Sequence, residues 1–232
     1  MRNEIILLCT IIIEFSMPIL SLKFFKKQGL ILWMVIATIA ANIEVMILVR
    51  AFGMEMTLGN ILFASTFLIT DISSEVYGEK ETKNIVKAGI FSFGIFTLIS
   101  ASWMLYIPSE NDIIKASIDK VFAHTPRIMF VSLTVYIIVQ FLDIYLYHRI
   151  WQLTKKQFND AKRFLWLRNN VATIISQIIN SVLYTLLAFY GVYPLTVLIK
   201  IMISTCLIFI ATSIIDTPFL YLARRISLQG NK

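Results

Sequence analysis

Stretches of about 20 consecutive apolar residues recur along this chain, separated by short segments that hold most of its charge. A helix needs about that length to cross the hydrocarbon of a bilayer. Of the 232 residues, 58% are hydrophobic and 15% are charged, which is unlike an ordinary soluble domain. No run of alternating strands, as in a membrane β-barrel, is present in the sequence. The sequence therefore predicts an all-α, polytopic transmembrane helical bundle.

The apolar pattern predicts seven spans within one integral membrane domain over residues 1–232. They are Ile5–Leu22, Leu30–Val49, Leu58–Tyr77, Ile85–Ile107, Ile128–Tyr147, Val171–Tyr190 and Leu195–Leu222. The third is the least regular, because its apolar part ends at Thr70 and meets Asp71 and Glu75. It is either a full span or a re-entrant segment.

The loop charges favour seven spans, because Lys and Arg of short loops stay in the cytoplasm. The loops after spans one, three, five and seven carry fifteen basic residues: Lys23, Lys26, Lys27, Lys80, Lys83, Lys87, Arg149, Lys155, Lys156, Lys162, Arg163, Arg168, Arg224, Arg225 and Lys232. The other side carries five: Arg2, Arg50, Lys115, Lys120 and Arg127. We therefore expect a multi-pass protein of the cytoplasmic membrane, with its N-terminus outside and its C-terminus inside.

Several function classes find no support in the sequence. Cys9 and Cys206 lie in apolar runs without metal-ligand spacing, and the motifs of metalloproteases, serine hydrolases, P-loop proteins and C-x-x-C redox proteins are missing. The net charge of +7 indicates first the orientation of the loops across the membrane, since no aromatic-basic RNA-binding motif accompanies it. We expect no enzyme activity, no cofactor, no metal site and no nucleic-acid partner.

Ionisable residues within spans are the candidates for function, because each costs roughly 3 kcal/mol to place at mid-membrane. Asp71 and Glu75 are four residues apart and share one helix face. Together they could accept hydrogen bonds from an N–H-rich ligand, or hold a cation or a proton. The alternative is a solvated helix end paired with Lys80 or Lys83.

Span five carries a polar stripe at helical spacing, formed by Ser132, Tyr136, Gln140 and Asp143, with Arg127 at its outer entry. In lipid such a stripe must face protein or water. It either lines a polar cavity or joins helices by hydrogen bonds.

Span six repeats the pattern, with Gln177 and Asn180 on its polar face, so a cavity between spans five and six is expected. Lys200 is the one basic residue deep in a span, and its expected role is to neutralise a carboxylate of the cavity. In span two, Asn42 and Glu44 point to different faces, so at most one of them joins the cavity.

Four of these patterns together resemble the queuosine precursor transporter family, also described as vitamin-uptake-like transporters. Phe63–Gly78 contains the D-x-x-x-E-x-Y-G signature, and span five reproduces the family's spacing from Arg127 to Asp143. Trp166-Leu167-Arg168 with Ser176-Gln177, and Lys200 in the last helix, also match. The resemblance runs from about Asn42 to Ile210. It implies a family core over residues 30–222, preceded by an additional N-terminal helix over residues 5–28.

The resemblance implies import of small 7-deazaguanine precursors of the tRNA base queuosine: 7-cyano- or 7-aminomethyl-7-deazaguanine, or queuine. The expected substrate-binding residues are Asn42, Asp71, Glu75, Arg127, Tyr136, Gln140, Asp143, Gln177, Asn180 and Lys200. Asn180 departs from the family, where many relatives have Asp, so neither the substrate nor proton coupling at this position is settled. A homodimer or an energising partner stays open. The alternatives are a binding subunit of an ATP-energised uptake system, and a membrane sensor or assembly protein.

Overall fold

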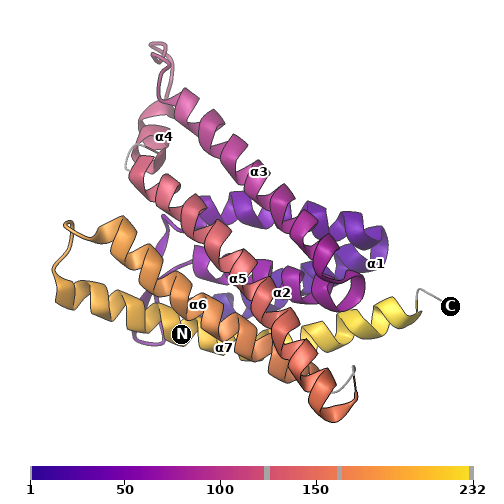
Figure 1. Ribbon diagram of the computed structural model, residues 1–232. Coiled ribbons are helices and arrows are strands. Elements are labelled where there is room, and N and C mark those ends of the chain that lie inside the picture. The colour runs from indigo at the N-terminus through magenta and orange to yellow at the C-terminus, as the bar shows by residue number, and fades with distance from the viewer. Residues whose placement is uncertain (1, 123–125, 161–163, 230–232) are drawn as a thin grey trace.

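The computed structural model describes residues 2–122, 126–160 and 164–229 as a bundle of long helices (Figure 1). The elements are α1 (Arg2–Glu44), β1 (Leu48–Ala51), β2 (Met54–Thr57), α2 (Gly59–Tyr77), α3 (Glu79–Trp103), α4 (Lys115–Phe122), α5 (Pro126–Phe158), α6 (Leu165–Phe189) and α7 (Leu195–Gln229). Lys162, Arg163 and Lys232, which entered the charge count, lie outside the described residues. The prediction of an all-α membrane bundle is confirmed.

Helix α1 contains the first two predicted spans as two arms. The backbone leaves helical geometry at Lys26, with φ 53° and ψ −133°. A Cβ on Gly29 would clash with the carbonyl oxygen of Ser21, so the second arm starts in backbone contact with the first. Asn3 Nδ2 donates a hydrogen bond to Arg50 O at 3.0 Å, which brings the start of the first arm to the segment that follows the second. The two arms therefore run in opposite directions.

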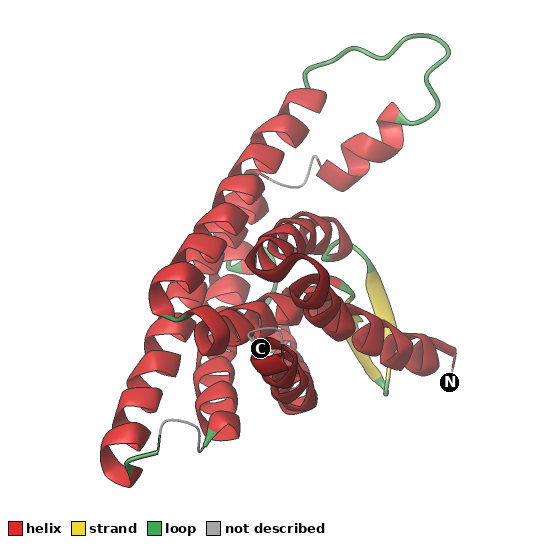
Figure 2. Ribbon diagram, turned by 90° about the vertical axis from the view of Figure 1, so that its right-hand side faces the viewer, coloured by secondary structure: helices red, strands yellow, loops and turns green. Residues whose placement is uncertain are grey.

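A β-hairpin follows α1, and the sequence analysis did not predict it. Strands β1 and β2 pair in antiparallel register from Leu48↔Thr57 to Ala51↔Met54. Phe52 and Gly53 form the turn with φ values of 52° and 74°, which suits a two-residue hairpin loop. The predicted extension of span two to Val49 was wrong, because the helix ends at Glu44 and Val49 belongs to β1. Figure 2 shows the strands beside the N-terminal arm.

Helix α2 lies at the centre of the bundle, against α1, α3, α5 and α7. Every residue from Ala64 to Ser74 is buried. Its 19 residues measure about 28 Å along the axis, close to the thickness of the bilayer hydrocarbon. Gly78, with φ 83°, ends α2, and α3 begins at the next residue. These features favour a full span for the third segment.

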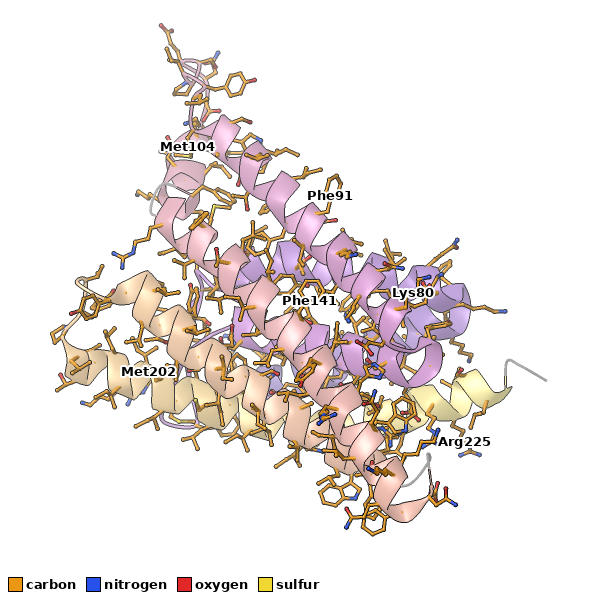
Figure 3. All side chains as sticks on the ribbon, viewed as in Figure 1. Lys80, Phe91, Met104, Phe141, Met202 and Arg225 are labelled. Atoms are coloured by element: carbon orange, nitrogen blue, oxygen red, sulfur yellow. The ribbon has the colours of Figure 1, made fainter. Side chains whose placement is uncertain are left out.

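Five described helices are long and apolar enough to cross a membrane: α1, α3, α5, α6 and α7. The two arms of α1 together with α2, α3, α5, α6 and α7 correspond to the seven predicted spans. Large apolar side chains cover the outside of the bundle, including Leu98 of α3, which is 72% exposed. Phe91 of the same helix is 68% exposed (Figure 3). A surface of this kind suits contact with lipid.

The two ends of the bundle differ in character. The hairpin end holds β1, β2 and α4. The basic end holds the turn between α2 and α3, the start of α6 and the last turns of α7. At the basic end Lys27 pairs with Glu81 at 3.0 Å and Lys83 pairs with Glu79 at 2.6 Å.

Candidate functional site

A pocket lies between six helices, nearer the hairpin end. It encloses about 570 Å³ of space between atoms, including some open to the surroundings. The lining residues are Thr38, Ala41, Asn42, Val45, Gly59, Asn60, Phe63, Phe93, Ser132, Tyr136, Asn180, Tyr184 and Phe209. Three of the ten predicted site residues are among them: Asn42, Tyr136 and Asn180.

Aromatic rings form one part of the pocket wall. The ring centroid of Phe63 lies 6.0 Å from that of Tyr136 and 6.2 Å from that of Phe209. The ring centroid of Phe93 in α3 lies 6.2 Å from that of Tyr136. Side chains of four helices thus supply flat, apolar surfaces against which a planar ring can pack.

Amide and hydroxyl groups form the polar part of the wall. Asn42, Asn60 and Asn180 each carry both donors and an acceptor, and Ser132 and Tyr184 add hydroxyls. Asn42 Nδ2 donates to Thr38 O at 2.6 Å, so one of its hydrogens is already used. Glu44 does not line the pocket, as expected from its spacing to Asn42. Planar rings and neutral amides together suit a flat, uncharged, heteroatom-rich ligand.

A second group of polar side chains lies about one helical turn beyond the pocket, toward the basic end. We call it the buried polar layer; its members are Thr66, Thr70 and Asp71 of α2, Gln140 and Asp143 of α5, Asn169, Thr173, Ser176 and Gln177 of α6, and Asp216 of α7. All are at most 2% exposed. Four predicted site residues, Asp71, Gln140, Asp143 and Gln177, belong to this layer and not to the pocket wall.

Hydrogen bonds within the layer link α2 to α5 and to α6. Gln140 Nε2 donates to Thr66 Oγ1 at 2.8 Å. Thr173 Oγ1 donates to Asp71 Oδ2 at 3.1 Å. The carboxyls of Asp143 and Asp216 are close enough to Asp71 to repel it electrostatically when they are charged. The layer thus brings three carboxyl groups together in the middle of the bundle.

Glu75 lies one turn beyond Asp71 and belongs to a cluster of ion pairs at the basic end. Arg168 Nη2 lies 2.5 Å from its Oε2, and Arg224 Nε lies 3.2 Å from its Oε1. Tyr147 donates its hydroxyl hydrogen to Glu75 Oε2 at 3.1 Å. The Arg168 guanidinium also packs 4.4 Å from the ring centre of Trp151. This cluster joins α2, α5, α6 and α7.

The pairing of Glu75 differs from the alternative considered in the sequence analysis. Lys83 pairs with Glu79, four residues before it in the same helix. Among the described residues, Lys80 forms no ion pair with Glu75, whose partners come from α6 and α7. Those partners lie far away in the sequence, so local spacing could not identify them.

Two predicted site residues lie away from the pocket. Arg127 Nη2 donates to Leu187 O at 2.8 Å and to Tyr190 O at 3.0 Å, so it caps the end of α6. The side chain of Lys200 is exposed, and in the described part of the chain it forms no ion pair with a carboxylate. The expected neutralisation of a cavity carboxylate by Lys200 is therefore not seen.

Sequence reasoning missed several residues of the pocket wall, among them Asn60, Phe93 and Phe209. Asn60 lies in the first turn of α2, and Phe93 and Phe209 lie within long apolar runs. A single phenylalanine in such a run gives no signal of its own. Asn60, a polar residue next to the predicted start of span three, was the one local hint.

Comparison with known proteins places this arrangement in context. The family described as “Putative vitamin uptake transporter” matches residues 57–223. A protein of Bacillus subtilis (strain 168), named “Probable queuosine precursor transporter”, is 36% identical over 214 residues, covering 92% of this chain and 91% of its own length. No solved structure matches. The expectation of a transporter, and not an enzyme, is confirmed.

Proposed function

Because this chain belongs to the vitamin uptake transporter family, we propose that it imports queuosine precursors across the cytoplasmic membrane. The observation that carries the proposal is the 36% identity to the Bacillus subtilis protein of that name, which extends over 92% of the chain. The proposed cargo is a 7-deazaguanine: 7-cyano-7-deazaguanine, 7-aminomethyl-7-deazaguanine or queuine.

The pocket supports this cargo by its chemistry. A deazaguanine is planar, so its faces can pack against Phe63 and Tyr136, whose centroids are 6.0 Å apart. Its edge carries adjacent N–H donors and a carbonyl, which the amides of Asn42 and Asn180 can match. The carboxyl of Asp71, farther toward the basic end, would accept N–H donors once the substrate moves past the aromatic rings.

The proposed orientation has the hairpin end outside and the basic end in the cytoplasm. It follows from the charge of the loops, because basic residues of short loops stay in the cytoplasm. In this orientation the pocket lies nearer the outer surface. The buried polar layer and the ion pairs of Glu75 then separate it from the cytoplasm, as in the outward-facing state of an alternating-access transporter.

Complementation tests the proposal. The gene is expressed in a bacterium that neither makes nor imports queuosine precursors, and queuosine in tRNA is measured at limiting external 7-cyano-7-deazaguanine. Wild type restores queuosine, whereas Asp71→Asn and Gln140→Ala restore less at equal membrane abundance. No restoration by wild type with any of the three precursors, at confirmed membrane expression, refutes the proposed cargo.

A pocket variant with a matched control locates the binding site. Asn180→Leu removes one amide from the pocket wall. We expect the half-saturating precursor concentration to rise about tenfold, because the precursor loses one or two hydrogen bonds. Gln152→Leu makes a similar change at an exposed position of α5 and leaves uptake unchanged. Uptake by the purified protein alone in liposomes distinguishes a self-sufficient transporter from a subunit that needs an ATPase.

A further inference from the structure

The Thr70 hydroxyl lies within hydrogen-bond distance of two acceptors but can donate to only one of them at a time. Its Oγ1 lies 2.7 Å from Phe67 O and 3.0 Å from Asp143 Oδ2. A hydroxyl has one hydrogen to donate, and both of these neighbours accept. If Thr70 donates to Phe67 O, the second bond is complete only when Asp143 carries a hydrogen and donates it to Thr70.

The surroundings of Asp143 have the same shortage of hydrogens. Within the described part of the chain, six buried oxygens of the layer have no hydrogen-bond partner: Asp71 Oδ1, Gln140 Oε1, Asp143 Oδ1, Asn169 Oδ1, Ser176 Oγ and Gln177 Oε1. Five of them can only accept, and only the Ser176 hydroxyl, which faces Asp143, can also donate. Gln177 is 1% exposed and Gln140 is fully buried, so water does not reach them freely. Such a surplus of acceptors calls for protons or a cation.

The amide orientations support this count. Thr66 donates to Phe63 O at 2.6 Å, so it can only accept from Gln140, which fixes Nε2 of Gln140 toward it. Asn169 donates through Nδ2 to Asp216 Oδ1 at 2.9 Å. The amide hydrogens are thus directed away from the oxygens that lack a partner.

The charged and titratable neighbours do not neutralise the carboxyls. Asp71 faces Asp143 and Tyr147 of α5, Arg168 of α6 and Asp216 of α7, and Glu75 follows it on its own helix. Arg168 is the one cation in this set, and its guanidinium lies 2.5 Å from Glu75. No cation therefore lies in direct contact with either Asp71 or Asp143 among the described residues.

The geometry favours a proton over a metal ion. Across the described residues, no three Asp, Glu, His or Cys side chains are arranged to hold a metal. The layer is fully buried and does not line the pocket, so there is little space for a larger ligand, whereas a proton needs none. Two carboxyls that are buried without a cation are far more stable when at least one is protonated.

We propose that Asp143 is protonated and donates a hydrogen bond to the Thr70 hydroxyl. The Asp71–Asp143 pair then couples substrate uptake to the proton gradient. The coupling to uptake rests on the proposed transport function, whereas the proton site does not. Asp143 lies two turns from Tyr136 of the pocket wall on the same face of α5, with Gln140 between them. Loss of the proton would leave two charged carboxyls next to each other in the closed layer. The layer is then destabilised, which opens the route toward the basic end.

Infrared spectroscopy of the purified protein tests the proton site without any transport. A protonated carboxyl has a C=O stretching band separate from that of a carboxylate. We expect wild type to show this band at neutral pH, Asp143→Asn to lose the component of the band that belongs to Asp143, and Asp143→Glu to shift that component. Asp119→Asn, an exposed carboxyl paired with Lys115 in α4, keeps it. Absence of the band in wild type, or a band that Asp143→Asn leaves unchanged, overturns the proposal whether or not the protein transports precursors.

Wild-type protein in liposomes tests the coupling. With 7-cyano-7-deazaguanine as the probe and an outside pH one unit below the inside, one proton per substrate supports about tenfold accumulation. A protonophore abolishes it. If accumulation is the same with and without the proton gradient, or depends on a sodium gradient instead, the proposed proton coupling is wrong. The transport function is then still supported. If no precursor enters under any condition, the proposed function fails and the infrared result alone decides the proton site.

Discussion

Replacing Glu75 by glutamine should destabilise the protein far more than the same replacement at Glu79. Glu75 accepts from Arg168 at 2.5 Å, Arg224 at 3.2 Å and Tyr147 at 3.1 Å, and the Arg168 side chain is fully buried. Breaking a buried ion pair by removing one partner costs about 3–5 kcal/mol. We expect about 3 kcal/mol, the lower limit, because Arg168 keeps its contact with Trp151.

Glu79→Gln is the matched control, four residues away at the same end of the bundle. Glu79 pairs with Lys83 at 2.6 Å, but both side chains are 43% exposed. An exposed pair at this spacing contributes about 0.3–0.5 kcal/mol.

Thermal unfolding of the detergent-purified variants measures the difference. For a chain of this size, 1 kcal/mol corresponds to about 2–4 °C in Tm, so Glu75→Gln should melt roughly 6–12 °C below wild type. Glu79→Gln should stay within about 2 °C of it. Equal melting temperatures for the two variants would refute the assignment of the Glu75 cluster as a buried link between four helices.

Three further predictions follow from the packing and the topology. Gly89→Ala should lower the free energy of unfolding by about 1–3 kcal/mol, because its Cβ would lie 2.8 Å from Tyr136 Oη and 2.9 Å from Met34 Cγ. On the same helix, the Cβ of Gly94→Ala would meet nothing within 4 Å. This control variant should be neutral or stabilising in the same melting assay. Lys200→Ala should retain precursor uptake in the complementation strain, since the side chain is exposed; loss of uptake would place Lys200 in the transport mechanism. A cysteine at Lys155 should react with an impermeant reagent only from the cytoplasmic side, and labelling from outside would reverse the proposed orientation.

The sequence was sufficient for the all-α membrane bundle and for the polar faces of the central helices. The stripe of Tyr136, Gln140 and Asp143 does face the bundle interior, because polar groups cannot be left in lipid. The sequence could not show which residues of the stripe line the pocket and which belong to the buried polar layer. That division depends on helix rotation and on the rings of Phe93 and Phe209, which are set by packing between distant segments.

The errors at Lys200 and Val49 have a similar origin. Lys200 lies in an apolar run, but only five residues after the start of α7, so its long side chain can reach the surface. Val49 continues an apolar pattern, yet pairing with Met56 places it in a strand. In both cases a hydropathy pattern was extended to a residue that the tertiary structure uses differently.

The complete burial of the middle of α2 bears on how the protein is made. With Asp71, Glu75 and several hydroxyl residues, α2 is not among the helices apolar enough to cross a membrane by themselves. Its carboxyls find partners on α5, α6 and α7, which are synthesised after it. Insertion of α2 from the translocon must therefore depend on its apolar neighbours α1 and α3, and the segment reaches its final position only when the C-terminal half of the chain has entered the bilayer. A ribosome that stalls before α5 would leave the central helix of the transporter without the partners that hold it.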